Sequence, residues 1–138
     1  MEALIQQFDN IAMVHHRTDY YNASEHTLVC MTHNNIDHVI TYSDIDENDI
    51  VGYIDGEHKY AHEIEPNPYC IWVDDTIVID CSATPRCITS MIREGFYEGL
   101  VPNCKLEFIE SNSEIMACVR AIKKIFRGEE LIIYKEYY

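Results

Sequence analysis

The sequence predicts a single, mostly β domain of the α+β class with two or three short helices. Three observations support this prediction. Short apolar segments rich in β-branched and aromatic residues recur between turn residues, as is typical of strands. These segments do not alternate regularly with helical patterns, so a parallel βαβ fold is not indicated. The chain of 138 residues is long enough for one hydrophobic core but not for two.

Residues 1–27 are expected to form an amino-terminal helix and a polar connection that pack on a main domain, residues 28–138. Leu4, Phe8 and Ile11 recur at helical spacing between residues 3 and 14, with polar side chains on the other faces. The segment after them, residues 15–22, is polar. The pattern therefore predicts an amphipathic helix of about three turns.

The main domain shows a series of strand patterns. We expect strands at residues 27–32, 38–42, 50–54, 69–73, 76–80, 106–108, 115–122 and 131–134. Turn residues separate them, including Asp55-Gly56 and Asn112. A helix is expected to begin at Thr84-Pro85, with Thr84 as its N-cap, and to end at Gly95.

The acidic composition restricts the possible partners. With 10 Lys+Arg and 24 Asp+Glu, the formal net charge is −14. Such a chain repels nucleic-acid backbones and anionic membranes, and it attracts basic proteins or peptides. Solubility alone is an alternative explanation for the same charge. No apolar segment approaches the roughly 20 residues that span a bilayer, and residues 1–7 lack the features of a signal peptide. We therefore expect an intracellular protein, cytoplasmic or nuclear.

Neither the histidines nor the cysteines have the spacing of a metal site. His58 and His62 would share one face if residues 58–63 were helical, but a third ligand is missing. The order His-Glu-x-x-His of metalloproteases is also absent. The six cysteines are dispersed without a Cys-x-x-Cys pair, which is typical of reduced core residues. No metal site is expected.

Four segments, taken in order, resemble the SET domain, the fold of one class of protein lysine methyltransferases. The chain has HVITYSDI followed by YIDGE where the family has G-V-F-A-x-x-x-I and Y-x-G-E. IDCSAT resembles I-D-A-T, and VPNC resembles the end of N-H-S-C-x-P-N-C. AIKKIFRGEEL resembles A-I-x-x-I-x-x-G-E-E-L. The resemblance covers about residues 28–138.

The resemblance implies a β-fold whose carboxy-terminal segment threads under a loop in a pseudoknot. It also implies that S-adenosylmethionine binds on one face, and that a substrate lysine enters from the other through a channel lined by tyrosines. A dry aromatic channel favours the neutral amine that methyl transfer requires. No metal is implied. The substrate would be a lysine in a basic protein tail.

The chain departs from the family pattern at three places, all near the cofactor or the channel. Ile36-Asp37-His38 replace a Gly-x-Gly motif, and glycine lets a backbone approach a ligand closely. By register, the cofactor-binding Asn-His pair falls on Tyr97-Glu98. The channel tyrosine falls on Lys135, and Tyr134 is one residue early, which puts a strand side chain on the opposite face.

The candidate site residues follow from the resemblance and its departures. The cofactor-binding candidates are Asp37, His38, Glu98 and Asn103, and the catalytic candidates are Tyr53, Tyr97 and Tyr134. Two functions remain open at this point. The first is a divergent S-adenosylmethionine-dependent protein lysine methyltransferase, similar to the small SET proteins of large DNA viruses. The alternative is a catalytically inactive SET-fold interaction or assembly module that has lost cofactor binding. The sequence does not predict the oligomeric state.

Overall fold

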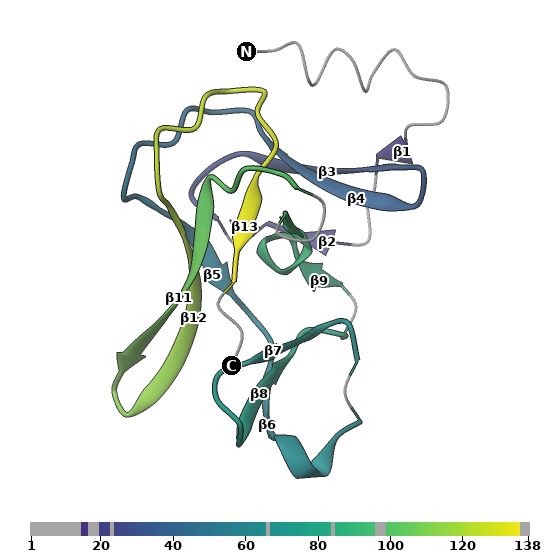
Figure 1. Ribbon diagram of the computed structural model, residues 1–138, viewed down its shortest axis with the longest axis vertical. Coiled ribbons are helices and arrows are strands. Elements are labelled where there is room, and N and C mark those ends of the chain that lie inside the picture. Colours follow the sequence, from purple (N-terminus) through teal and green to yellow (C-terminus); the bar gives the residue numbers. More distant parts are fainter. Residues whose placement is uncertain are drawn as a thin grey trace.

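The structure is a computed structural model that describes residues 15–16, 20–22, 24–65, 67–83, 85–95 and 99–135. These residues form several small β-sheets and two 3-10 turns, and they include no α-helix (Figure 1). The mostly β prediction is confirmed. The helix predicted between residues 3 and 14 lies outside the described residues.

The first sheet contains strands β1 (His15–His16), β3 (Leu28–His33) and β4 (Ile36–Thr41), all antiparallel. Asn34 and Asn35 close the β3–β4 hairpin with φ angles of 53° and 62°. Asparagine tolerates this left-handed conformation better than most residues do, so the turn can be tight. The two long strands of this sheet match the predicted segments 27–32 and 38–42.

The largest sheet has the order β10-β13-β11-β12-β5. Its strands are β10 (Arg93–Glu94), β13 (Ile132–Tyr134), β11 (Cys104–Ser111), β12 (Glu114–Ala121) and β5 (Ile50–Ile54). β13 pairs in parallel with both β10 and β11. The final strand of the sheet therefore lies between two strands that follow one another in the sequence (Figure 1).

The other sheets are smaller. One contains β6 (Glu57–Tyr60), β8 (Ile77–Asp80) and β7 (Cys70–Trp72), which form the end of the molecule farthest from β3 and β4 (Figure 1). The other pairs β2 (Tyr20–Tyr21) in parallel with β9 (Arg86–Cys87). The hairpin predicted for residues 69–80 is confirmed by the β7–β8 pairing.

The helix predicted from Thr84-Pro85 to Gly95 is wrong. Residues 86–94 form β9, a 3-10 turn η2 (Ile88–Met91) and β10. The turn is buried on several sides, since Ile88, Thr89 and Met91 are all inaccessible to solvent. Thr89 Oγ1 also donates a hydrogen bond of 2.7 Å to the carbonyl of Tyr53. These contacts surround the segment, whereas an amphipathic helix would keep one face in water.

The possible helix at residues 58–63 is likewise not formed. His58 lies in β6 opposite Ile79, and His62 lies in a 3-10 turn, η1 (Ala61–Glu63). His58 and His62 therefore do not share a helical face. Residues 57–60 are strand and not helix, because β6 pairs with β8 along its whole length.

The main hydrophobic core of the described residues joins the sheets, and Met31 and Ile40 form a separate small cluster. The main core includes Val39 from β4, Val51 from β5, Ile79 from β8 and Val119 from β12, all fully buried. The loop that follows β4 and the loop that precedes β13 are fixed to one another beside this core. Ile45 and Ile125 exchange backbone hydrogen bonds of 2.8 and 2.9 Å, so residues 41–49 lie against residues 121–131. This packing determines where β13 begins.

Candidate functional site

Asn103 anchors the start of β13. Its side-chain Oδ1 accepts a hydrogen bond of 2.9 Å from the backbone N–H of Ile132, and its Nδ2 donates one of 2.9 Å to the carbonyl of Glu130. Its own backbone N–H also donates to the carbonyl of Ile132, at 3.0 Å. Asn103 is 4% exposed. The Asn103 side chain was predicted to contact a cofactor. Its amide instead makes its hydrogen bonds to the backbone of residues 130 and 132.

His38 takes part in a buried charged cluster at the same place. Its Nδ1 lies 3.0 Å from Glu130 Oε1. Arg93, from β10, donates to the two oxygens of that carboxylate at 3.1 and 2.9 Å. The cluster connects β4, β10 and the residues before β13, and a bidentate Arg–carboxylate pair of this kind is geometrically specific. The structure thus brings His38 and Asn103 together around Glu130, where both support β13.

Of the two remaining cofactor candidates, the structure describes only Asp37, which lies in the β3–β4 hairpin. Asp37 accepts a hydrogen bond of 2.8 Å from Thr32 Oγ1, its partner across the β3–β4 hairpin. Glu98 and the catalytic candidate Tyr97 lie outside the described residues.

Tyr53 and Tyr134 lie on the outer face of the large sheet. Their side chains are 42% and 43% exposed, respectively. The pairing puts Tyr53 opposite Cys118 and Tyr134 opposite Lys105. Strands β11 and β12 separate the two tyrosines, so they do not line a common channel.

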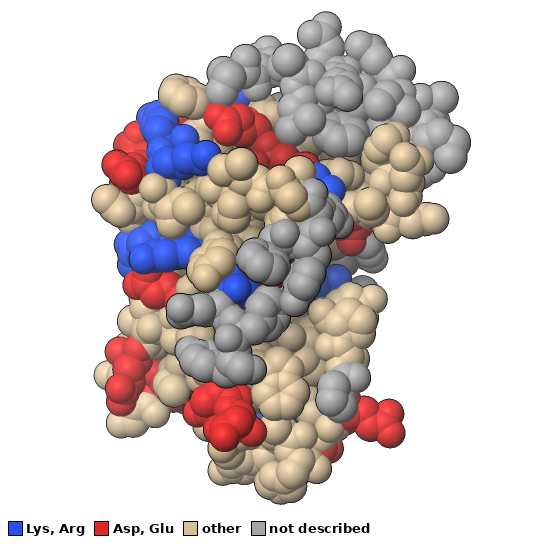
Figure 2. All heavy atoms as spheres, viewed as in Figure 1, with Lys and Arg blue, Asp and Glu red and all other residues tan. Residues whose placement is uncertain are grey.

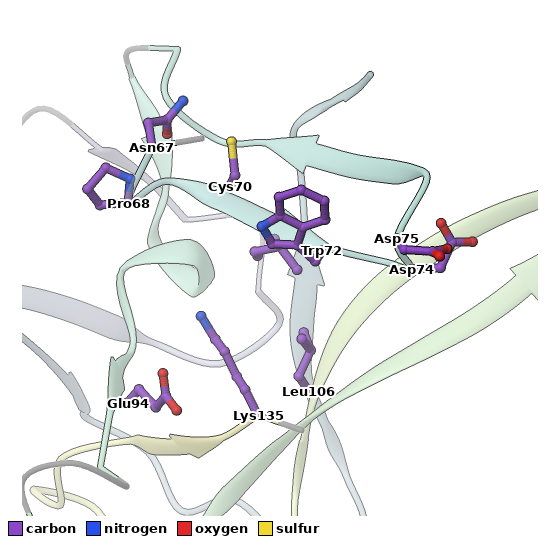
Figure 3. A pocket seen from close by; sticks show the side chains of 10 residues that line it. Asn67, Pro68, Cys70, Trp72, Asp74, Asp75, Glu94, Leu106 and Lys135 are labelled. Atoms are coloured by element: carbon purple, nitrogen blue, oxygen red, sulfur yellow. The ribbon is translucent and has the colours of Figure 1, made fainter. Parts of the chain in front are cut away.

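A pocket of about 590 Å³ opens between the small sheet and the end of β13. Its walls come from β7, β10 and β11. Lys135, the residue that follows β13, extends its side chain into the pocket (Figure 3). Small-molecule sites in proteins commonly have volumes of this order. The lining residues are Asn67, Pro68, Cys70, Ile71, Trp72, Asp74, Asp75, Glu94, Leu106 and Lys135.

Alternation along β13 explains why Lys135 faces inward. Ile133 is buried in the core and Tyr134 is exposed, so the next side chain returns to the inner side. Burial lowers the pKa of the Lys135 amine, while the negative charge of Glu94 opposes that effect. The one-residue displacement of Tyr134 noted in the sequence thus corresponds to an exposed tyrosine and an inward lysine.

Lys135, Trp72, Glu94 and Leu106 were not among the sequence-predicted site residues. The alternation from Ile133 through Tyr134 was the available signal for Lys135. No comparable signal marked Trp72 or Leu106, because their proximity depends on how the small sheet packs against β11. These contacts join segments far apart in the chain.

A smaller pocket of about 340 Å³ has two thiols, Cys81 and Cys87, among its lining residues. The backbone N–H of Asp55 donates to Cys87 Sγ at 3.3 Å. A hydrogen bond from Cys81 and others from neighbouring groups lower the pKa of Cys87 to about 5, while the same contact raises the pKa of Cys81. Cys87 is therefore the thiol of the pair that is more easily ionised.

Within the described ranges, no three His, Cys, Asp or Glu side chains lie close enough together to hold a metal ion. The same part of the chain contains no helix that is both long enough and apolar enough to cross a membrane.

No model of a known protein family matches the sequence, and no curated protein is significantly similar to it. Functional inference therefore depends on the geometry of these residues.

Proposed function

We propose that the chain is a SET-like domain that binds a basic, lysine-containing protein segment without transferring methyl groups to it. One observation carries the proposal most strongly. Among the described residues that the resemblance assigns to cofactor and channel, His38 and Asn103 make contacts that hold the fold, and the side chains of Tyr53 and Tyr134 are turned outward. In contrast, the segments of the resemblance that place β13 in the sheet still have a structural role.

The placement of β13 supports the SET-like fold. It lies between β10 and β11, and Asn103 holds it there through both side-chain and backbone hydrogen bonds. A carboxy-terminal strand inserted between two earlier strands is compatible with the pseudoknot that the resemblance implies. Fold alone is only associational support for an activity.

The charge in the pocket argues against methyl transfer there. Lys135 takes the inward position at which the resemblance expects a tyrosine hydroxyl. When protonated, its ammonium group repels both the sulfonium of S-adenosylmethionine and an incoming lysine cation. A tyrosine hydroxyl would instead orient the lysine nitrogen.

The acidic end of the molecule is the surface best suited to a basic partner. We define it by six exposed carboxylates, those of Asp55, Glu57, Glu63, Glu65, Asp74 and Asp75. Lys59 is the basic side chain of that segment, and it is held 3.0 Å from Asp80. Separate groups of acidic side chains lie over the lower part of the molecule in Figure 2, as others do over its upper part. Such a field attracts lysine-rich segments and raises their rate of association.

The test is calorimetric titration with a short peptide of alternating lysine and serine. Asp74→Asn combined with Asp75→Asn should weaken binding several-fold, because each exposed pair contributes about 1 kcal/mol or less. The control combines Glu110→Gln with Glu114→Gln, which removes the same charge from the tip of the β11–β12 hairpin, where both residues are exposed. Equal losses in the two variants, or no binding by the unaltered protein, would contradict the proposed surface.

The second candidate function is a divergent S-adenosylmethionine-dependent methyltransferase. One observation favours it: the pocket beside β13 has the volume of a small-molecule site, an indole wall from Trp72 and a carboxylate from Glu94. Aromatic faces and carboxylates both attract a sulfonium.

Titration with S-adenosylmethionine and with its demethylated product separates the two functions. The proposed binding module should take up neither compound at millimolar concentration. Binding of both, with methyl transfer to a lysine peptide, would establish the enzyme and overturn the proposal.

A further inference from the structure

The pocket beside β13 contains an amine in surroundings unlike those of the chain's other lysines. Trp72, Ile71 and Leu106 supply aromatic and aliphatic walls. The Lys135 side chain points into the pocket between Glu94 and Leu106 in Figure 3. In contrast, Lys59 lies 3.0 Å from Asp80, and Lys124 lies 2.6 Å from Asp46. Those carboxylates raise the pKa of Lys59 and Lys124 and favour their charged forms.

We propose that this pocket binds a small, neutral aromatic aldehyde or ketone, and that Lys135 forms an imine with it. Asp74 and Asp75 belong both to the acidic end and to the pocket wall. The inference does not depend on the proposed function, because it concerns a small molecule that reacts with Lys135 inside the pocket and not a protein bound to the acidic end. A cavity of about 590 Å³ is large enough for a single aromatic ring and its substituents.

The reaction requires no oxidant or reductant. The lone pair of the neutral Lys135 amine attacks the carbonyl carbon and forms a carbinolamine. The carbon–oxygen bond then breaks, the oxygen leaves as water with two protons, and a carbon–nitrogen double bond remains. Glu94 lies on the pocket wall beside Lys135 and is the carboxylate placed to move a proton from nitrogen to oxygen.

The charged groups around Lys135 act in both directions. Burial and the positive charge of Arg86 lower the pKa of its amine, while the negative charges of Glu94 and of Cys81, when ionised, raise it. Burial is the largest of these effects. The fraction of neutral amine at pH 7 is therefore greater than for an exposed lysine, and it changes about tenfold for each unit of pKa.

The pocket also determines which carbonyl compounds are accepted. Glu94, Asp74 and Asp75 line it, so an aldehyde that carries a carboxylate is repelled. The exposed indole of Trp72 offers a face on which a neutral aromatic ring can stack. We therefore expect benzaldehyde to react faster than 4-carboxybenzaldehyde at this lysine.

The experiment traps the imine in the full chain. The protein is incubated with benzaldehyde and sodium cyanoborohydride at pH 7, digested with a glutamate-specific protease, and analysed by mass spectrometry for benzylation of each lysine. Lys135 should react faster than Lys59 and Lys124, because burial lowers the pKa of its amine while nearby carboxylates raise theirs. Its rate should also reach half-maximum at a lower pH than theirs.

Two comparisons distinguish a binding site from an amine that is merely reactive. Replacing benzaldehyde with 4-carboxybenzaldehyde should slow the reaction at Lys135 more than at Lys105 and Lys123. Trp72→Ala should slow it at Lys135 and leave the rates at Lys105 and Lys123 unchanged.

The proposal is overturned if Lys135 in the unaltered protein reacts no faster than Lys123, or if both aldehydes show the same ratio of rates at the two lysines. Both of these rate comparisons use the unaltered protein, so the test does not depend on whether a variant folds.

Discussion

Asn103 connects three backbone groups of the segment 130–132 through a single buried residue. Its side chain bonds to Glu130 and Ile132, and its backbone bonds to Ile132 again. Loss of the amide would leave the carbonyl of Glu130 and the N–H of Ile132 without these partners in a region closed to water. Unsatisfied buried polar groups are more costly than the net value of the bonds they lose.

Asn103→Ala should therefore lower the free energy of unfolding by about 2–4 kcal/mol, since it removes two buried hydrogen bonds. Urea unfolding followed by circular dichroism measures the change. The control is Asn22→Ala, whose side chain also makes two bonds to backbone, to His26 and from Ser24, but in an exposed loop. Water replaces those bonds, so the control should lose less than 1 kcal/mol. Similar losses in both variants would remove Asn103 from its anchoring role.

Asp80 gives a second residue-scale prediction, on acid stability. Hydrogen bonds from Ser82, and then the contact with Lys59, lower its pKa from 3.8 to about 2. A carboxyl whose pKa is lower in the folded state stabilises the fold above its unfolded pKa, and this contribution is lost as pH falls through the folded pKa. We expect unfolding to become easier between about pH 4 and pH 2.

Asp80→Asn should reduce this part of the acid dependence and leave the protein less stable at neutral pH. Thermal unfolding measured between pH 7 and pH 2 tests the effect. Asp75→Asn is a suitable control, because Asp75 is exposed and its loss should leave the slope in that range unchanged. An unchanged slope in Asp80→Asn would contradict the prediction.

Single residues of the site were only partly predictable from the sequence. The displacement of Tyr134 by one position was visible, and strand alternation gave the correct orientations of Tyr134 and Lys135. The engagement of His38 with Glu130 and Arg93 was not visible, because these residues are far apart in the chain. Motif matching located Asn103 but not the backbone groups it serves.

At the scale of elements, the strands with clear β-branched and aromatic patterns were predicted well. β5 occupies residues 50–54 as predicted, and β11 and β12 form a hairpin whose turn includes Asn112. The short elements between residues 84 and 95 were predicted wrongly as a helix. There the local signals for helix start and stop were outweighed by burial of Ile88, Thr89 and Met91 on several sides.

Gly95 gives a prediction at the scale of the β10–β13 contact. A methyl group added there would lie 2.4 Å from Ile132 Cγ2 and 2.9 Å from Leu100 Cβ. Gly95→Ala should therefore force β10 and β13 apart and cost about 1–3 kcal/mol of unfolding free energy. Chemical denaturation gives the value.

Gly99→Ala is the matched comparison for Gly95→Ala. No atom lies within 4 Å of the added methyl group, but the φ angle of Gly99 is 69°. Its cost should be backbone strain of about 1 kcal/mol. Adding Ile132→Ala to each variant should relieve part of the steric conflict in the Gly95 variant alone, because alanine lacks the Cγ2 atom that the added methyl group would meet. A Gly95 variant as stable as the unaltered protein would mean that the strands separate without penalty.

For the whole molecule, the excess of acidic residues has a cost in stability as well as a use in binding. A net charge of −14 produces repulsion that is relieved when the chain unfolds and expands. The exposed carboxylates of the acidic end are concentrated around β6, β7 and β8. Salt should weaken this repulsion because it shortens the range of the interaction.

Raising sodium chloride from about 10 mM to about 150 mM should therefore raise the melting temperature, since the Debye length falls from about 30 Å to about 8 Å. Differential scanning calorimetry measures the shift. The Asp74→Asn, Asp75→Asn variant should show a smaller shift than the unaltered protein. A melting temperature that falls with salt would indicate that attractive ion pairs, such as Lys124 with Asp46, outweigh the repulsion.

The position of β13 also has a consequence for biosynthesis. The ribosome synthesises β10 and β11 before residues 132–134, yet these two strands become neighbours of β13 and not of each other. Until β13 emerges from the exit tunnel, the space between them cannot close, and their hydrogen-bonding edges remain unpaired. The nascent chain therefore completes its largest sheet only after translation of β13, and until then it is a substrate for chaperones that protect open strand edges.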